Sequence, residues 1–304
     1  MRDDLGMDTP LARELADLSA RRRALESIDV SFSGETRILT VSNQKGGVGK
    51  TTSAVNIAAA LAQLGAKVLV IDLDPQGNAS TALGVTHTAD TSSIYDVLIN
   101  DLPFEEIVQQ SPESPNLVAA PSTIHLAGAE IELVSQVARE FRLRRALETY
   151  LQTHPTDVVV IDCPPSLGLL TINAFTAASE VFIPIQCEYY ALEGLSQLLG
   201  SIQMIQKHLN PELHLSTILL TMYDGRTRLA QQVADEVRTH FPEQVLETVI
   251  PRSVRVSEAP SFGQTVITYD GTSAGAVAYR EAAVEIARRA QRDDEANQNQ
   301  KKEN

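Results

Sequence analysis

The sequence has little of what secreted and membrane-spanning proteins need. It contains two cysteines, Cys163 and Cys187, among 304 residues. Two cysteines cannot form a disulfide framework, so we expect both to be reduced core residues. No run approaches the roughly eighteen apolar residues of a membrane span, and the first stretch, MRDDLGMDTP, is polar and acidic, unlike a signal peptide. We therefore expect a cytoplasmic protein.

Positive charge is also scarce, since the formal net charge is −14. Such a chain repels polyanions, so any contact with DNA must come from a local basic patch. No helix-turn-helix pattern is evident, which argues against recognition of a base sequence. The apolar content of 43% is enough for one large α/β core.

The most informative segment is KGGVGKTT, from Lys45 to Thr52. An apolar run precedes it at residues 38–42, and apolar residues at helical spacing follow over residues 51–64, so it joins a strand to a helix. Glycines let the backbone turn tightly and direct N–H groups inward, and the helix start adds its positive dipole end. This arrangement is typical of a loop that binds nucleotide phosphates.

The loop carries two lysines where a phosphate-binding loop ordinarily needs one. Lys50 is expected to reach the β- and γ-phosphates of ATP, and the Thr51 hydroxyl to bind Mg²⁺. Gln44 stands where the pattern GxxxxGK[ST] has its first glycine, which makes this the deviant form of the loop. The expected nucleotide-binding residues are Gly46, Gly47, Val48, Gly49, Lys50 and Thr51.

Two apolar runs, residues 67–72 and 157–162, end in aspartate. They read as parallel strands buried on both faces, whose carboxyl ends line a ligand crevice beside the phosphate loop. Asp162 is expected to hold Mg²⁺ through a water, and Asp74, just beyond the first run, to orient the attacking water. The alternative for each aspartate is a turn residue at a strand end.

Further strand-like runs predict a doubly wound α/β fold, a mostly parallel sheet with helices on both faces. The runs lie at residues 116–120, 180–186, 215–222 and 245–250. Between them, residues 124–151 have apolar positions at helical spacing and predict the longest helix, with a break near Gly128. Its arginines read as a solvated face, and they are Arg139, Arg142, Arg144 and Arg145.

The chain resembles the ParA/Soj partition ATPases, a family of deviant phosphate-loop proteins. KGGVGKTT, VLVIDLDPQGN and VVVIDCPPS occur in this order, and TMYDGRTRLAQQV and IPRSVRVSEAPS follow them. The resemblance covers roughly residues 37–290. It implies an ATPase that partitions chromosome or plasmid DNA, with ATP and Mg²⁺ as cofactors and a homodimer that sandwiches ATP between its subunits.

The same resemblance implies roles for individual residues. Lys45 reaches across the dimer into the partner's ATP, Thr52 contacts phosphate, and Asp74 is needed for hydrolysis. Pro251 and Ser253 lie against the adenine. Geometry supports the role of Lys45, because one loop can hardly use two lysines on one phosphate group.

The resemblance also implies that the ATP dimer coats the nucleoid by binding double-stranded DNA non-specifically, until a ParB-type partner triggers hydrolysis and release. The matching surface arginines are Arg226 and Arg255, with Arg228 and Arg252 beside them. Because each subunit offers few contacts, doubling them in the dimer would make DNA affinity depend on ATP. The alternative is that these arginines pair with neighbouring carboxylates such as Asp224 or Glu258.

Two rival functions share parts of this pattern. A MinD-like regulator of division-site placement needs a basic amphipathic C-terminal helix, and nothing apolar follows Ala296. An iron–sulfur reductase bridges a cluster with two cysteines from each subunit, and the count of cysteines alone does not exclude it. The DPQGN and SEAP segments favour partition.

Two segments lie outside the expected ATPase domain of residues 37–290. Residues 1–36 form an extension in which residues 10–25 predict a short amphipathic helix capped by Thr9. This helix could pack on the ATPase core or the other subunit, dock a separate partner, or lie on a membrane. Residues 291–304 are polar and predict a disordered tail.

Overall fold

A computed structural model describes residues 9–32, 34–189 and 191–303. One eight-stranded sheet has the order β3-β4-β2-β5-β1-β6-β7-β8 and is parallel except for β3, which runs antiparallel to β4. The strands are β1 (Arg37–Val41), β2 (Val68–Asp72), β3 (Gln109–Gln110), β4 (Leu117–Ala120), β5 (Val158–Asp162), β6 (Glu180–Gln186), β7 (His214–Tyr223) and β8 (Val245–Pro251). The doubly wound fold predicted from the sequence is therefore confirmed.

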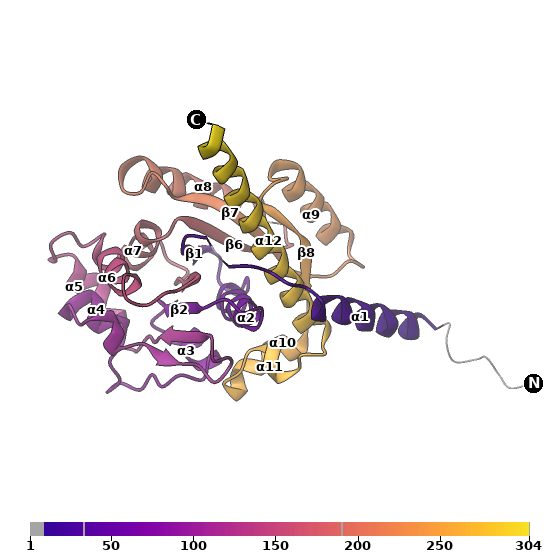
Figure 1. Ribbon diagram of the computed structural model, residues 1–304, viewed down its shortest axis with the longest axis horizontal. Coiled ribbons are helices and arrows are strands. Elements are labelled where there is room, and N and C mark those ends of the chain that lie inside the picture. The colour runs from indigo at the N-terminus through magenta and orange to yellow at the C-terminus, as the bar shows by residue number, and fades with distance from the viewer. Residues whose placement is uncertain (1–8, 33, 190, 304) are drawn as a thin grey trace, which may run out of the picture.

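Helices cover both faces of this sheet (Figure 1). One core lies between the sheet and α2, α3, α10, α11 and α12. Two further cores lie on the other face, under α4 to α7 and under α7 to α9. The helices are α1 (Pro10–Glu26), α2 (Lys50–Gln63), α3 (Asn78–Ala82), α4 (Ile94–Asn100), η1 (Phe104–Glu106), α5 (Leu126–Leu133), α6 (Arg142–Leu151), α7 (Leu169–Ala177), α8 (Ala191–His208), α9 (Arg228–His240), α10 (Val254–Glu258), η2 (Ala259–Phe262), α11 (Val266–Tyr269) and α12 (Ala274–Glu303).

The register of the central strands sets the position of the acidic residues. β2 and β5 are buried along their whole length, as continuous runs of valine and isoleucine dictate in a parallel sheet. Their pairing puts Asp72 directly opposite Asp162, and Val41 at the end of β1 lies opposite Asp162 on the other side. Both carboxylates therefore reach the carboxyl edge of the sheet next to the loop that follows β1.

The prediction of one long helix over residues 124–151 was wrong. Two shorter helices, α5 and α6, replace it, and the break follows Leu133 rather than Gly128. Side chains of α7 hold the backbone between them, because Asn173 Nδ2 donates to the Arg139 carbonyl at 2.8 Å and the Thr176 hydroxyl donates to the Glu140 carbonyl. Ala138, at φ 50°, adds a left-handed turn. Tertiary hydrogen bonds thus override the helical spacing of the sequence.

Among the described residues, the longest helix is α12, which continues to Glu303. The disordered tail that the composition of residues 291–304 predicts stays a prediction. Within the described part of the chain, no helix is both long and apolar enough to cross a membrane.

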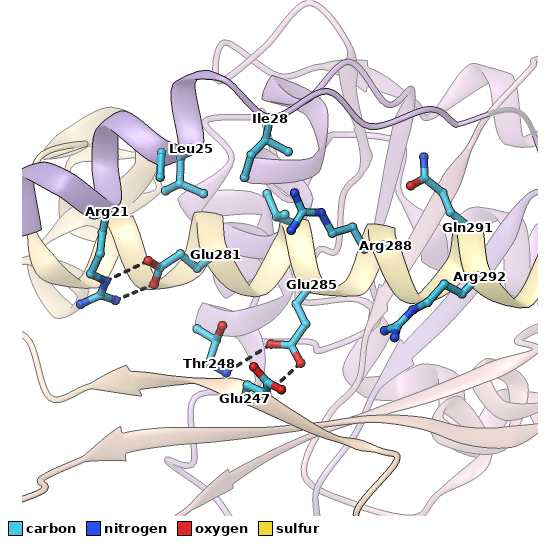
Figure 2. Close-up of a pocket in the computed structure, with 12 residues that line it drawn as sticks. Arg21, Leu25, Ile28, Glu247, Thr248, Glu281, Glu285, Arg288, Gln291 and Arg292 are labelled. Atoms are coloured by element: carbon cyan, nitrogen blue, oxygen red, sulfur yellow. Dashed lines mark hydrogen bonds and ion pairs between the residues drawn. The ribbon is translucent and has the colours of Figure 1, made fainter.

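The N-terminal helix α1 packs on α12 (Figures 1 and 2). Thr9 caps it as expected, since its hydroxyl accepts from the Ala12 N–H at 3.2 Å. Arg21 forms a two-pronged ion pair with Glu281, with Nε 2.8 Å from Oε1. Figure 2 shows Leu25 and Ile28 pointing toward α12, over a groove of about 850 Å³ that β8 closes on its far side.

Candidate nucleotide-binding site and basic edge

The phosphate loop connects β1 to α2 at the carboxyl edge of the sheet. Gly47 and Gly49 adopt φ of 74° and 86°, a left-handed conformation that glycine adopts without strain. The Thr221 hydroxyl donates to the Val48 carbonyl at 2.8 Å, so β7 fixes the loop from behind. The expected strand, loop and helix are all present, and the loop exposes Gly46 and Gly47 toward solvent.

The two lysines of the loop point to different places. Lys50 is 8% exposed, and its Nζ donates to the Lys45 carbonyl at 3.3 Å inside the loop. Lys45 is exposed, and its Nζ lies 2.6 Å from a carboxylate oxygen of Glu188. The Lys45 N–H donates to the Asn43 side chain at 3.0 Å, which orients this part of the loop.

Lys50 is poorly compensated without a ligand. Burial lowers its pKa, and the carboxylates of Asp162 and Asp74 oppose this change. Within the described residues this ammonium group donates to one carbonyl, and a buried ammonium group favours an anionic partner. The phosphates of a nucleotide supply that partner, since the N–H groups at the start of α2 face the same space.

Asp162 is the strongest candidate for holding a cation. It is 0% exposed, and neither carboxylate oxygen has a hydrogen-bond partner among the described residues. Burial raises its pKa well above the usual range, the neighbouring Asp72 raises it further, and Thr51 and Lys50 oppose the shift. A buried carboxylate with two open oxygens is compensated by a divalent cation.

The donor set fits Mg²⁺. Among the described residues, no group of three His, Cys, Asp or Glu side chains could enclose a metal ion. Mg²⁺ typically takes one or two protein oxygens and completes its shell with water and substrate phosphates. Thr51 and Asp162 offer a hydroxyl and a carboxylate beside the phosphate loop, which matches that preference.

Asp72 and Asp74, at the end of β2, differ in burial and in hydrogen bonding. Asp72 is buried and accepts hydrogen bonds from the Ser80 N–H and hydroxyl at 2.8 and 2.7 Å, and from the Asp74 N–H at 3.1 Å. Burial raises its pKa to about 6. Asp74 is half-buried, and its carboxylate accepts only the Gln76 N–H at 3.0 Å within the described chain. Asp72 therefore braces the turn that presents Asp74 to the site.

Three of the residues in this geometry were missed by sequence reasoning. Glu188 follows β6 by two positions and holds Lys45, but it stands in no phosphate-loop pattern. Asn43 orients Lys45 and is itself held by the Pro184 carbonyl at 2.8 Å. Ser80, which braces Asp72, lies in a short helix after DPQGN. The pairing of β1 with β6 brings Glu188 to Lys45 and Pro184 to Asn43, whereas Ser80 reaches Asp72 through the turn that follows β2.

Pro251 and Ser253 lie at the carboxyl end of β8, three strands along the sheet from β1. Both are half-buried, and Ser253 precedes α10 in the N-cap position. The phosphate loop also follows the carboxyl end of a strand, so Pro251, Ser253 and the loop lie at the same edge of the sheet. Their contact with the adenine stays a prediction.

The four candidate arginines share the same edge, because Tyr223 and Pro251 are paired at the ends of β7 and β8. Arg226, 90% exposed, forms a two-pronged pair with Asp224 at 2.8 Å. Arg255 pairs with Glu258 at 3.2 Å and Asp270 at 3.4 Å. This is the pairing that the sequence left open as an alternative.

Arg228 and Arg252 differ from the other two arginines. Both are exposed, and neither lies within ion-pairing distance of a carboxylate in the residues that the structure describes. The side-chain hydrogen bond from Arg226 is the main reason that the pKa of Asp224 is lowered to about 2, and the charge of Arg252 contributes to the same shift. The edge is therefore a patch of four cations with three partly exposed carboxylates among them.

Both cysteines are core residues, as expected. Cys163 is 0% exposed and its Sγ lies 3.1 Å from the Thr40 hydroxyl, and Cys187 is 7% exposed. Burial raises the pKa of Cys163 to about 12 and that of Cys187 to about 11. A ligand to a cluster shared between subunits must be a thiolate at the surface, so these positions do not suit the iron–sulfur alternative.

The fold and the loop together define a phosphate-loop nucleoside triphosphatase of the deviant type. A family model described as an AAA domain matches residues 36–215. The chain is 53% identical over 251 residues to the sporulation initiation inhibitor protein Soj of Bacillus subtilis, covering 83% of this chain and 98% of that one. It is 51% identical to the chromosome partitioning protein ParA of Myxococcus xanthus, covering 83% and 88%. The chain belongs to the ParA/Soj family of chromosome-partitioning ATPases.

Solved structures agree with this assignment. A Mycobacterium smegmatis protein described as cobyrinic acid a,c-diamide synthase, with bound ADP and magnesium, is 40% identical with a TM-score of 0.70, over 82% of this chain and 92% of that chain. The cell division ATPase MinD of Pyrococcus furiosus is 25% identical with a TM-score of 0.66, over 84% and 98%. The chain is an ATPase that uses ATP and Mg²⁺, and its named relatives favour partition over division-site placement.

Proposed function

We propose that this chain segregates DNA through a cycle of ATP-dependent dimerisation. Two copies sandwich ATP between their phosphate loops, the dimer binds double-stranded DNA without reading its sequence, and a ParB-type partner stimulates hydrolysis and release. The chain then acts in the cytoplasm, associated with the nucleoid. The names of its relatives, chromosome partitioning protein ParA among them, support this cycle.

The divergence of the two lysines is the observation that carries the proposal. Lys50 occupies the interior of its own loop, where a phosphate chain would meet it. The Lys45 side chain points away from the loop and pairs with the exposed Glu188 carboxylate. Its ammonium group can therefore exchange this carboxylate for a phosphate bound to another chain. A nucleotide placed between two such loops joins them only while its γ-phosphate is present.

Hydrolysis follows from the positions of the acidic residues. Asp74 orients the water that attacks the γ-phosphate, while Lys45 and Lys50 stabilise the charge that develops on the phosphoryl oxygens. Thr51 and, through a water, Asp162 would hold Mg²⁺, which would neutralise charge on the β- and γ-phosphate oxygens of ATP. Thr52 contacts phosphate, and Pro251 and Ser253 lie against the adenine.

The basic edge is the proposed DNA surface. Arg226, Arg228, Arg252 and Arg255 project from the ends of two neighbouring strands, so they present charge from one side of the molecule. Exposed ion pairs such as those of Arg226 and Arg255 are weak, and a DNA phosphate can replace the carboxylate. A dimer doubles the number of contacts, which offsets the repulsion expected from a net charge of −14.

For the N-terminal extension, α1 packs on α12 of the same chain, which is the first of the roles that the sequence left open, and Leu15 on this helix is 58% exposed. Docking of a further protein on α1 is kept as the alternative role.

One comparison tests the proposed cycle. Duplex DNA of arbitrary sequence is titrated with the protein and a slowly hydrolysed ATP analogue, and then with the protein and ADP. We expect binding with the analogue and little with ADP, because only the analogue keeps the γ-phosphate. Equal binding in both states, or none in either, would contradict the proposal.

A further inference from the structure

Two arginines line a small pocket between the N-terminal extension and the core. The pocket has a volume of about 200 Å³ and lies where α1 meets α12 and the end of α2. Arg22 enters it from α1, Arg280 from α12, and Gln63 from the last turn of α2. The family model begins at residue 36, so α1 and Arg22 precede the part of the chain that this model describes. The extension therefore completes a pocket that the core alone does not form.

Neither arginine has an anionic partner among the described residues. The Nε atom of each is buried and has no hydrogen-bond acceptor there. The Nη atoms of Arg280 reach the carbonyls of Gly271 and Ile267 only at 3.5 Å, beyond the usual length of such a bond. No carboxylate of the described chain lies within ion-pairing distance of Arg22 or Arg280. Withdrawing a guanidinium from water without a good acceptor is costly.

The charge of the pocket is positive. Burial lowers the pKa of Arg280, the carboxylate of Glu26 opposes this change, and the charge of Arg22 adds to it. Glu26 also lines the pocket, but it is exposed. One exposed carboxylate does not balance two half-buried guanidinium groups, so an anion between them would relieve both their repulsion and their missing hydrogen bonds.

We propose that this pocket binds a small oxyanion of the phosphate type, which joins the guanidinium groups of Arg22 and Arg280 and so fastens α1 to α12. The planar guanidinium donates parallel hydrogen bonds to the oxygens of such an anion. Since one water fills roughly 30 Å³, the pocket has room for phosphate together with a few waters. It lies at the far end of α2 from the phosphate loop, about 20 Å away along the helix, so it is separate from the nucleotide site.

Amide hydrogen exchange of α1 in the full chain tests the proposal. Phosphate is titrated against chloride at constant ionic strength, because general screening of charge must stay the same. An anion that binds only the docked helix slows its opening in proportion to the occupancy of the site. We expect exchange of residues 10–26 to slow by about tenfold when phosphate reaches about ten times its Kd. Sulfate should act as phosphate does.

Three variants separate this pocket from the phosphate loop, which also binds phosphate. Arg22→Gln should keep α1 at least as well docked without phosphate, because one of two like charges is gone, and should lose the response to phosphate. Arg22→Glu places a carboxylate opposite Arg280, so α1 should be protected without phosphate and gain nothing from it. Arg23→Gln is the matched control, because Arg23 is exposed on the same helix and does not line the pocket; it should respond like the wild type.

The remaining outcomes overturn the proposal. Equal exchange of α1 in phosphate and in chloride would show that the pocket binds no oxyanion. A full response to phosphate in Arg22→Gln would place the bound phosphate elsewhere, in the phosphate loop for example. If Arg22→Gln and Arg22→Glu both undock α1 in every salt, Arg22 is a packing residue. If acetate protects α1 and phosphate does not, the pocket takes a carboxylate and the assignment to phosphate is wrong.

Discussion

Lys45 and Glu188 form an ion pair of 2.6 Å across the mouth of the phosphate loop. The Lys45 side chain is 40% exposed and the Glu188 side chain 46%, so water screens the attraction between them. Lys45 must leave this carboxylate before it can reach a nucleotide on another chain. The pair therefore competes with the dimer for the same ammonium group.

Removing the competitor should favour the dimer. In Glu188→Gln, Lys45 loses its charged partner, and an exposed pair stabilises by about 1 kcal/mol at most. Because the dimer breaks one such pair in each subunit, we expect the concentration for half-dimerisation with an ATP analogue to fall by up to about thirtyfold, measured by sedimentation velocity. A weaker dimer would show that Glu188 contributes a contact of its own.

Removing Lys45 should have the opposite and larger effect. Lys45→Ala leaves Lys50 and the loop glycines in place, so each monomer should still bind ATP within a few-fold of the wild-type affinity. The ATP-dependent dimer should disappear, because the contact across the interface is gone. Light scattering with the ATP analogue checks this, and dimerisation by the variant would contradict a role for Lys45 across the interface.

Asp74 offers a test of the hydrolytic step. Asp74→Ala should lower the hydrolysis rate by roughly 10² to 10⁴, the scale of a positioned acid or base, and leave nucleotide affinity and dimerisation intact. The variant should accumulate as a DNA-bound dimer. Steady-state phosphate release and nucleotide affinity are measured together, because an equal loss of both would assign Asp74 to Mg²⁺ or to folding.

The local sequence was sufficient to predict those features of the site that depend on residues adjacent in the chain. The run KGGVGKTT specifies a strand, a glycine turn and a helix start, and each was found where expected. The valine and isoleucine runs specify buried parallel strands, each ending in an aspartate at the carboxyl edge of the sheet. That Asp72 and Asp162 lie side by side depends in addition on the pairing of β2 with β5, which the runs do not specify.

Features that depend on distant residues could not be predicted in the same way. Glu188 meets Lys45 only because β6 lies beside β1, and the spacing of residues 124–151 gave no sign that Asn173 and Thr176 would capture the carbonyls between α5 and α6. The partners of Arg226 and Arg255 were left open for the same reason. Sequence periodicity describes one element, whereas these contacts join two.

The basic edge provides the last prediction. If Arg226 contacts DNA in the ATP dimer, Arg226→Ala removes two phosphate contacts per dimer, one from each subunit. Each lost contact reduces the magnitude of the slope of log affinity against log salt concentration by about 0.9. The slope of the variant should therefore be closer to zero by about two. The loss should be similar for any DNA sequence, because phosphate contacts position a protein without reading bases. Arg145→Ala, at an exposed site on α6, is the matched control.

Arg255 separates a DNA contact from a structural one. Its guanidinium joins Glu258 in α10 to Asp270 after α11, and both segments border the expected adenine site. Arg255→Ala should reduce DNA binding and its salt slope as Arg226→Ala does, with ATPase activity in the absence of DNA nearly unchanged. DNA binding at several salt concentrations and dimerisation with the ATP analogue are measured on the same variant. If dimerisation weakens as much as DNA binding, Arg255 stabilises the α10–α11 segment and the DNA surface consists of Arg226, Arg228 and Arg252.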